Sequence, residues 1–362
     1  MSNTNTNRRN FLIGAAAVAG AGLVANTVGG SRLLAAEAQN APRKQVMVAG
    51  KRIKVVDIHG HLVVPKSEAL LTGSAVKGDY PKNQIMGPER LARMDARGID
   101  MQVISINQYW WYPAERDLAS KIVRAHDEGV AEWCKGHSDR FVGLTSPSLQ
   151  HPDLAAEQLD YAVKTLGLKG ASIGGNVKGE MPSSAKYDPF WKKAEELQVP
   201  IFMHPTNAEN LAEDKSFEGN GDLGNIVGNP FETTLFLTKL IFDGVFDRFP
   251  RLKVVGAHGA GYLPSYFGRT EVTCDVRPNA KCANKKRPNE YLKTNIVADS
   301  MVFSDEGLRH LVAEMGASQI VYGSDMPFNW PDTIPIVTDA KFLSNEQKEA
   351  ILGANLIRLL KI

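Results

Sequence analysis

The sequence predicts one large α/β domain that folds as a (β/α)8 TIM barrel, and three observations support this prediction. From Val46 onward, eight short apolar segments alternate with segments of helical periodicity. Side chains able to bind a metal stand directly after four of these segments. No Gly-x-Gly-x-x-Gly turn follows the first segment, so the alternative, a doubly wound sheet that binds a dinucleotide, has no support.

Each apolar segment is short and rich in β-branched residues, as expected of buried parallel strands. The eight predicted strands are Ile53 to Ile58, Met101 to Ile106, Phe141 to Thr145, Lys169 to Ile173, Val199 to Met203, Leu252 to Ala257, Thr294 to Val297 and Gln319 to Tyr322. The helical patterns between them are Pro88 to Arg97, Glu115 to Lys135, Asp153 to Thr165, Asp188 to Leu197, Phe231 to Phe242 and Asp305 to Met315. A barrel of this kind places its active site at the C-terminal ends of the strands.

Residues 1–38 are predicted to be a twin-arginine export signal. The motif Asn7-Arg8-Arg9-Asn10-Phe11-Leu12 precedes a run of Ala, Gly and Val, and small residues follow near Ala38. A membrane anchor is the alternative, but the run is short and rich in glycine. We therefore expect cleavage after Ala38, a linker over 39–52, a barrel over 53–362 and a periplasmic protein carried by the twin-arginine machinery.

Composition excludes some classes of partner. The formal net charge is +2 and the Lys and Arg residues are scattered, so nothing indicates binding to nucleic acid or to an anionic membrane. The cysteines Cys134, Cys274 and Cys282 have neither zinc-ribbon nor redox spacing. Cys274 and Cys282 either pair in an oxidising compartment or remain free thiols.

Four of the eight histidines follow predicted strands. His59 and His61 end the first strand, and their spacing of two residues puts both imidazoles on one side of it. His204, His258 and Asp325 follow three later strands. Five ligand-capable side chains at one end of the barrel predict a metal site.

The motifs at these positions resemble those of a known family. They are Asp57-Ile58-His59-Gly60-His61, His204-Pro205, His258-Gly259-Ala260-Gly261-Tyr262-Leu263-Pro264, Gly323-Ser324-Asp325-Met326-Pro327 and Ile351-Leu352-Gly353-Ala354-Asn355. In this order they are similar to the amidohydrolase-related proteins, which are metal-dependent barrels of the hydrolase type. The branch they resemble contains 2-amino-3-carboxymuconate 6-semialdehyde decarboxylase and the resorcylate decarboxylases.

The resemblance implies a role for each matching residue. The metal ligands are His59, His61, His204 and Asp325. His258 and Asp325 act on protons, and Arg269 clamps a substrate carboxylate unless it is an exposed helix arginine. It also implies a homodimer.

Ligand chemistry favours a single ion. Three imidazoles and one carboxylate suit Zn²⁺ first and Mn²⁺ as the alternative. In binuclear members of the wider superfamily that the chain resembles, a carboxylated lysine or a glutamate on the fourth strand bridges two metals. The strand Lys169 to Ile173 has its only lysine at its start and no acid at its end, so the resemblance implies one metal.

The function expected from this resemblance is non-oxidative decarboxylation of an aromatic or unsaturated carboxylic acid, a small-molecule substrate. The same ligands also permit a hydrolase of a lactone or amide, or a hydratase. A non-catalytic binding protein is disfavoured by the complete ligand set beside His258. The arginine that the aminocarboxymuconate enzyme carries after its first strand has no clear match, so that substrate is not predicted.

Four further features each have two interpretations. Asp57 orients an imidazole or is simply buried in hydrogen bonds, and Glu232, in the first turn of a helix, is favoured as structural. The aromatic stretch from Gln108 to Tyr112 forms a wall for a flat ring or packs at the barrel rim. The glycine-rich segment from Asn207 to Asn229 is a lid or a disordered surface loop.

Overall fold

The structure is a computed structural model that describes residues 42–74, 76, 82–107, 110–206, 208, 210–213 and 215–362. The predicted export signal, Gln108 and Tyr109 of the aromatic stretch, and residues 207, 209 and 214 of the predicted lid lie outside the described residues. No helix among the described residues is long and apolar enough to cross a membrane.

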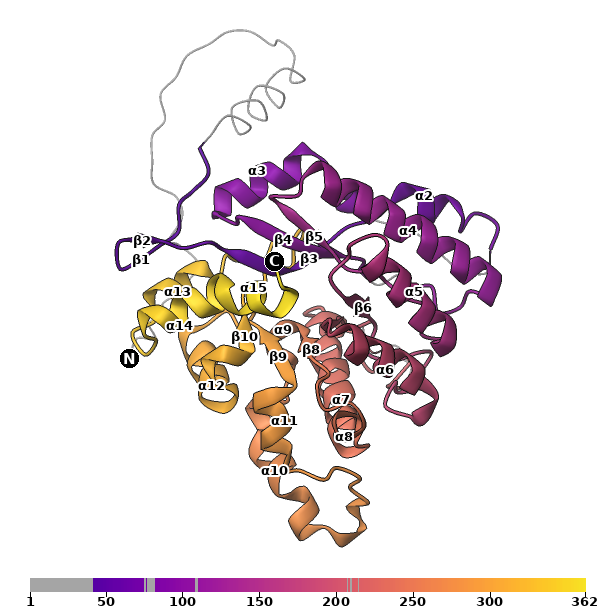
Figure 1. The fold of residues 1–362 in the computed structure, drawn as a ribbon. Helices are drawn as coiled ribbons and strands as arrows, with labels where there is room; N and C mark the ends of the chain where they lie inside the picture. The colour runs from indigo at the N-terminus through magenta and orange to yellow at the C-terminus, as the bar shows by residue number, and fades with distance from the viewer. Residues whose placement is uncertain are drawn as a thin grey trace, which may run out of the picture. The chain divides into compact units, whose positions relative to one another are not determined.

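Eight parallel strands form the barrel, and all eight were predicted (Figure 1). They form a sheet in the order β3-β4-β5 and a second in the order β10-β9-β8-β7-β6. Their bounds are β3 (Val56–His61), β4 (Met101–Ser105), β5 (Phe141–Gly143), β6 (Ala171–Ile173), β7 (Ile201–Met203), β8 (Val254–Gly256), β9 (Ile296–Asp299) and β10 (Ile320–Val321).

Backbone hydrogen bonds join the two sheets into a closed ring. On one side, the N–H of Thr145 donates to Gly170 O at 3.0 Å, beside a parallel bridge between Thr145 and Ala171. On the other side, the N–H of Ile58 donates to Tyr322 O at 2.9 Å, and the N–H of His61 donates to Met326 O at 2.7 Å. The predicted barrel is therefore confirmed.

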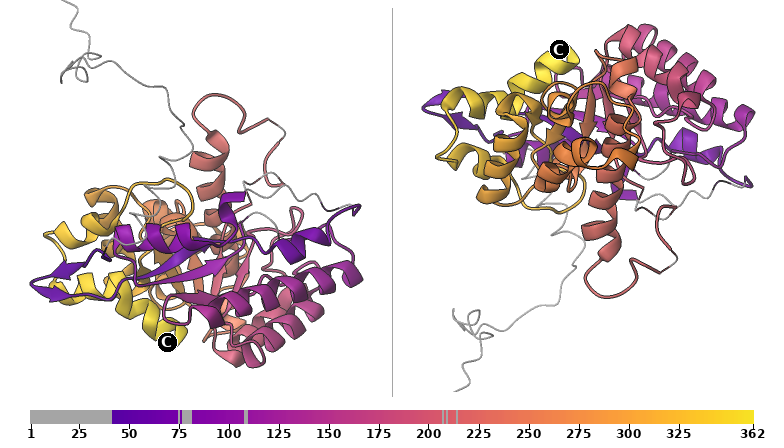
Figure 2. Two further views of the ribbon diagram at one scale, coloured as in Figure 1. Left: turned by 90° about the horizontal axis from the view of Figure 1, so that it is seen from above. Right: turned by 90° about the horizontal axis from the view of Figure 1, so that it is seen from below.

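Helices surround the strands (Figure 2). They are α2 (Pro65–Ala69), α3 (Pro88–Arg97), α4 (Arg116–Gly136), α5 (Pro152–Lys164), α6 (Asp188–Leu197), α7 (Asn229–Phe242), α8 (Val245–Arg248), α9 (Ala257–Ala260), α10 (Phe267–Val276), α11 (Pro288–Thr294), α12 (Asp305–Met315), α13 (Ile334–Asp339), α14 (Asn345–Glu349) and α15 (Asn355–Leu360). Local chemistry sets their ends: α3 begins with Pro88 at its first position and stops at Gly98, whose φ is 83°.

Part of the segment predicted as a linker is docked on the barrel. It forms the antiparallel hairpin β1 (Met47–Val48) and β2 (Lys51–Arg52). Arg43 donates hydrogen bonds to Asp95 and Asp100, both at 3.0 Å.

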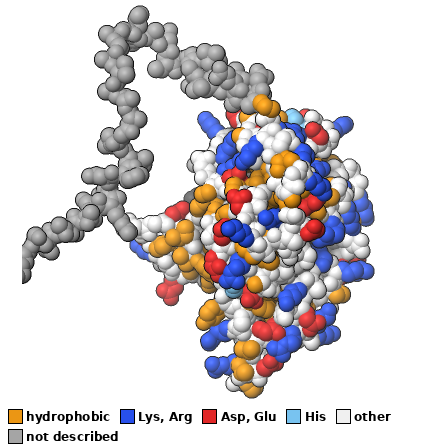
Figure 3. Space-filling model, turned by 90° about the vertical axis from the view of Figure 1, so that its left-hand side faces the viewer, with side chains coloured by type: hydrophobic (Ala, Val, Ile, Leu, Met, Phe, Trp, Pro, Cys, Tyr) orange, Lys and Arg blue, Asp and Glu red, His pale blue; other side chains and the backbone are white. Residues whose placement is uncertain are grey.

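Charged side chains of both signs are interspersed on the face drawn in Figure 3.

Side chains of the C-terminal helix α15 fill part of the barrel interior. Strand residues such as Ile58, Phe202 and Val321 form one buried cluster with Leu356 and Leu360 of α15. A second, larger cluster lies between the strands and the surrounding helices. The C-terminal helix is thus part of the core.

The C-terminal motif explains how this helix is held. An alanine Cβ at Gly353 would lie 2.1 Å from the carbonyl oxygen of Lys54, so only glycine permits this approach of the π-helix η7 (Ala350–Ala354) to the chain before β3. The side-chain amide of Asn355 donates to Ala317 O and Ile320 O, both at 2.8 Å. Glycine and asparagine therefore fix the last helix against the first and last strands.

Gly353→Ala should lower the free energy of unfolding by about 1–3 kcal/mol, because the new methyl group forces the η7 segment away from Lys54. Urea denaturation measures this change. The control is Gly136→Ala, because nothing lies within 4 Å of the added Cβ there. Equal effects of the two substitutions would contradict the packing argument.

Candidate metal centre

The structure brings all five predicted ligand-capable side chains together at one end of the barrel. His59 and His61 lie on β3, and His204, His258 and Asp325 follow β7, β8 and β10. The imidazole centroid of His59 lies 4.9 Å from that of His61 and 5.1 Å from those of His204 and His258. Each strand therefore delivers its side chain to the same point.

Two of these residues have backbone conformations that side chains rarely adopt. His258 and Asp325 both have φ 56°, in the left-handed region. Such strain persists where surrounding contacts enforce it, and it is concentrated at functional sites. It turns both side chains inward immediately after their strands.

Asp325 is the hub of the cluster. Its Oδ1 lies 3.0 Å from His61 Nε2 and 3.3 Å from His59 Nε2, and its Oδ2 lies 3.9 Å from His258 Nε2. His59 Nε2, His61 Nε2 and Asp325 Oδ1 are buried and lack a hydrogen-bond partner. Buried polar atoms without partners are costly, and a cation at their centre would satisfy all three.

Possible ligand atoms of His59, His204, His258 and Asp325 lie within 4.8 Å of one another. This group contains His258, which sequence reasoning assigned to catalysis, and omits His61, which faces the same carboxylate. His258 is also set apart by exposure, because 17% of its side chain is accessible, whereas His59 and His61 are fully buried. The residues present fit one divalent cation with either histidine as the last ligand.

The second nitrogen of three imidazoles contacts an oxygen. His59 Nδ1 lies 2.8 Å from Asp299 Oδ2, His61 Nδ1 lies 3.3 Å from Ile106 O, and His204 Nδ1 lies 3.0 Å from Pro205 O. Each contact favours the tautomer with its proton on Nδ1. This tautomer leaves the lone pair of Nε2 for a metal.

Electrostatics favour the ligand form of most of these groups. Burial lowers the pKa of His61 to about 4, and burial followed by the charges of His61 and His59 lowers the pKa of His204. Burial opposes ionisation of Asp325, but His59, His258 and His61 together outweigh it and hold the pKa of the carboxyl well below its usual range. Burial also opposes protonation of His59, yet Asp325 and Asp299 raise its pKa.

Sequence reasoning missed Asp299, which orients the centre. Its Oδ2 accepts from the backbone N–H of His258 at 3.0 Å as well as contacting His59, and its Oδ1 accepts from Gly259 N at 2.8 Å and Met301 N at 3.1 Å. Asp299 is the last residue of β9. It therefore lies at the C-terminal end of a strand, the position from which the metal ligands were predicted. The predicted strand stopped at Val297, two residues too early.

Asp57 has the structural role that was one of its two interpretations. Its carboxylate accepts from His59 N at 2.9 Å, Ser324 N at 3.0 Å and Gln102 Nε2 at 2.7 Å. Arg90 extends this network, donating to Gln102 Oε1 at 2.9 Å and His61 O at 2.6 Å. The network ties β3 to the loop that carries Asp325.

A cavity of about 380 Å³ opens onto the centre. Its lining is mostly amide and aromatic: Asn107, His204, Asp222, Asn225, Asn229, His258, Asp325, Phe328, Asn329 and Trp330. Asp222, Asn225 and Asn229 belong to the segment that was interpreted as a lid or a surface loop, so part of that segment lines the cavity. The volume lies within the range of small-molecule sites.

Two arginines of α3 hold one wall of this cavity. Arg93 donates to Pro327 O at 2.8 Å and to Asn329 Oδ1 at 3.1 Å, and Arg97 donates to Trp330 O at 2.7 Å. The wall segment is therefore fixed by a helix that does not itself reach the centre.

The aromatic stretch is described from Trp110 to Tyr112. One of its side chains lies at the metal centre, and the other two pack away from it. The Trp110 ring stacks on His204, with centroids 6.1 Å apart and planes at 27°. Trp111 packs against His126, and the Tyr112 hydroxyl accepts from Gly174 N at 3.0 Å. Of these three, only Trp110 touches a ligand residue.

Glu232 is structural, as favoured. Its buried carboxylate accepts from Thr206 N at 2.6 Å, Ala208 N at 2.9 Å and Asn176 Nδ2 at 3.0 Å. It therefore shapes the chain that leaves His204.

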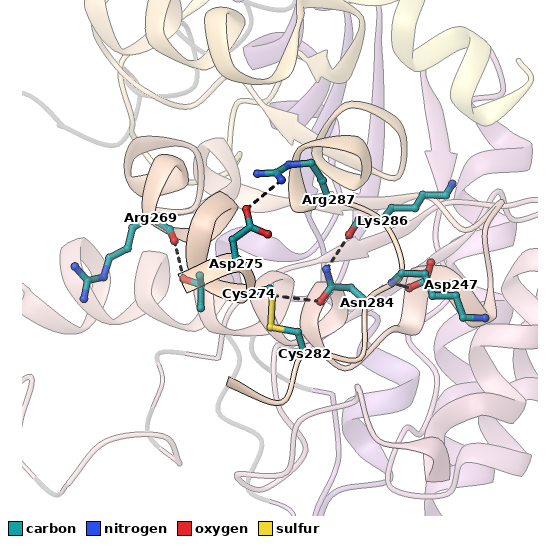
Figure 4. Close-up of a disulfide and its surroundings, with 10 residues drawn as sticks. Asp247, Arg269, Cys274, Asp275, Cys282, Asn284, Lys286 and Arg287 are labelled. Atoms are coloured by element: carbon teal, nitrogen blue, oxygen red, sulfur yellow. Dashed lines mark hydrogen bonds and ion pairs between the residues drawn. A yellow bond between two sulfur atoms is a disulfide. The ribbon is translucent and has the colours of Figure 1, made fainter. Parts of the chain in front are cut away.

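Arg269 lies on α10 with an exposed side chain, and it does not line the cavity at His258. Figure 4 shows its guanidinium directed away from the neighbouring disulfide. Within one chain, Arg269 is not brought to the centre, and its role as a carboxylate clamp stays a prediction.

Asp299→Asn should weaken metal binding by about 10- to 100-fold, because the amide no longer fixes the Nδ1 proton of His59. Metal content by elemental mass spectrometry and titration with Mn²⁺ or Zn²⁺ measure this. Asp100→Asn is the control, because Asp100 is also buried but bonds to Val55 N and Arg43. Unchanged affinity in Asp299→Asn would contradict the orienting role.

Comparison with known proteins identifies relatives over most of the chain. A 2-amino-3-carboxymuconate-6-semialdehyde decarboxylase from Dictyostelium discoideum is 33% identical over 280 residues, which are 75% of this chain and 75% of that protein. A gamma-resorcylate decarboxylase from a Rhizobium species is 30% identical over 329 residues, which cover 85% of this chain and 98% of that protein.

The fold is also similar to that of 5-carboxyvanillate decarboxylase from Novosphingobium aromaticivorans, solved with manganese and 4-hydroxy-3-methoxy-5-nitrobenzoic acid. The TM-score is 0.77 and the identity 23%, over 86% of this chain and 96% of that one. The amidohydrolase family model matches residues 56–362, which include every residue of the centre. The chain therefore belongs to the amidohydrolase family.

Proposed function

We propose that this protein is a metal-dependent decarboxylase of an aromatic or unsaturated carboxylic acid. The observation that carries the proposal is the meeting of His59, His61, His204 and Asp325 beneath a cavity that His258 also faces. The decarboxylase relatives described above support the reaction type.

The cavity suits a flat ring with polar substituents. Phe328 and Trp330 offer apolar faces, and Asn107, Asn229 and Asn329 offer amide groups for hydroxyl or carboxylate oxygens. Asn107 Oδ1 and Asn229 Oδ1 are buried without partners, so a ligand hydroxyl would complete their hydrogen bonding.

Each residue of the centre has a role in this reaction. His59, His61, His204 and Asp325 would hold one divalent cation, which would supply positive charge beside the substrate carboxylate and a neighbouring oxygen. A proton adds to the carbon that bears the carboxylate, the bond to that group breaks, and its electron pair returns to the ring as CO₂ leaves. His258, partly exposed and 3.9 Å from Asp325 Oδ2, carries this proton.

The donor set supports Zn²⁺ and Mn²⁺ as the candidate ions. The structural neighbour solved with manganese makes Mn²⁺ the first ion to load beside zinc.

Purified protein loaded with Mn²⁺ or Zn²⁺ should release CO₂ from hydroxybenzoic acids. His258→Asn should lower kcat by about 10²- to 10⁴-fold while metal content stays at one equivalent, because a general acid contributes about that factor. Mass spectrometry detects the CO₂ and the decarboxylated ring. A parallel panel of lactones and amides tests the hydrolase alternative, and acid released there without CO₂ from any carboxylate would overturn the proposal.

We also propose export to the periplasm. Cys274 and Cys282 form a disulfide with Cα atoms 6.1 Å apart (Figure 4), which is one of the two outcomes left open by the sequence. Disulfides form and persist in oxidising compartments, so this pairing supports the twin-arginine signal independently of its motif.

In a bacterial host with a twin-arginine route, the full chain should appear in the periplasmic fraction with the disulfide formed. Replacing Arg8 and Arg9 together by lysine should leave it in the cytoplasm, because the paired arginines are the feature that the export machinery reads. Fractionation and thiol labelling measure both. The same distribution for both chains would contradict export by this route.

We further propose a homodimer that buries apolar side chains around α10. Tyr266 is 67% exposed and Val276 62% exposed, with Tyr262 and Val272 beside them in the chain. Several large exposed apolar residues on one short stretch are typical of an interaction surface. Light scattering after gel filtration should give a dimer for the wild type and a monomer for Val276→Glu, whereas Phe342→Ser, at an exposed apolar residue on another segment, should stay dimeric. A monomeric wild type would refute the proposal.

A further inference from the structure

A second cavity, of about 330 Å³, lies at the end of the barrel opposite the metal centre. Pro200 and Lys253 line it from positions just before β7 and β8, whereas His204 and His258 follow those strands. It shares no lining residue with the cavity at the centre. Its volume falls at the lower end of the range for small-molecule sites.

Four cationic side chains surround this cavity: Arg251, Lys253, Arg358 and Lys361. Only Arg251 approaches a carboxylate, at 4.0 Å from Glu195. In the described ranges, no ion pair neutralises the other three.

The contacts of the other three cations are with neutral oxygens. Lys253 Nζ donates to Thr294 O, Arg358 donates to Asn355 Oδ1 at 2.9 Å, and Lys361 Nζ donates to Gln198 Oε1 at 3.3 Å. Among the described residues, these three cations therefore have hydrogen-bond acceptors but no carboxylate that balances their positive charge.

The surroundings of Lys253 disfavour its positive charge. It is half-buried, and burial followed by the charge of Arg358 lowers the pKa of its ammonium group. Placing like charges together against low-dielectric protein is unfavourable unless an anion joins them.

The remaining lining is largely apolar. Val199, Pro200, Val297, Val321 and Leu359 contribute aliphatic surface between the cations. Inorganic phosphate would use only the charges, whereas an anion with an apolar body would use both kinds of surface. We propose that this cavity is a second ligand site, which binds a small organic carboxylate. The anionic group of the ligand lies between Lys253 and Arg358, and its apolar body lies against these aliphatic side chains.

The site lies between elements that must both be folded for it to exist. Arg358 and Leu359 come from α15, which plugs the barrel, and Val321 comes from β10. A ligand here binds the native state alone and raises the temperature of unfolding. The proposal is independent of the reaction at the metal centre.

Isothermal titration of the metal-loaded protein with cyclohexanecarboxylate, a saturated carboxylate that the proposed decarboxylation does not consume, tests the proposal. The wild type should show two classes of site, one at each end of the barrel. Lys253→Gln combined with Arg358→Gln should weaken one class by at least about tenfold, because each charge-assisted hydrogen bond contributes on this scale, and should leave metal content unchanged. The matched control removes two paired surface cations, Arg309→Gln with Lys192→Gln, and should keep both classes.

Lys253→Arg keeps the charge and should keep the second class, which separates loss of binding from loss of folding. A single class that survives in the double variant would overturn the proposal. Inorganic phosphate that binds the second class of site as tightly as cyclohexanecarboxylate would overturn the organic part of the proposal, because the aliphatic side chains that line the cavity would then contribute nothing.

Discussion

Closure of the barrel between its first and last strands is the constraint on which the centre depends. The two backbone hydrogen bonds from β3 to the chain around β10 place His59 and His61 beside Asp325, which is more than 260 residues away in sequence. Without that closure, the ligands would lie at opposite edges of an open sheet. Closure of the ring therefore brings together ligands that are distant in the sequence. It also fixes the positions of the other strands, and the remaining ligands follow those strands.

Periodicity and strand ends were the features that could be predicted from the sequence. Short apolar segments identified all eight strands, and the rule that barrel sites lie at their C-terminal ends identified His204, His258 and Asp325. Asp299 was missed because a strand boundary carries an error of about two residues, and here that error hid a ligand-orienting group. The aromatic stretch shows the converse limit, because proximity along the chain does not say which way a side chain points. Trp110 stacks on His204, whereas the next residue, Trp111, packs against His126.

Burial has opposite effects on the groups of the centre. It keeps His61 and His204 neutral, which prepares them as ligands, but it would also protonate Asp325 and Asp299 if the surrounding imidazoles and N–H groups did not oppose it. Asp57, in contrast, has its pKa raised, because burial outweighs the hydrogen bonds from Ser324 and Gln102. Three buried carboxylates on neighbouring strands of the ring thus serve different purposes. Asp57 completes the backbone framework, Asp299 orients His59, and Asp325 faces the imidazoles of the centre.

The position of α15 has a consequence for how the protein unfolds. Leu356 and Leu360 share one buried cluster with Val56, Val255 and Val321, which belong to three different strands. Detaching this helix would expose apolar side chains inside the ring of strands to water. The barrel and the helix that fills it should therefore unfold together, as one cooperative unit.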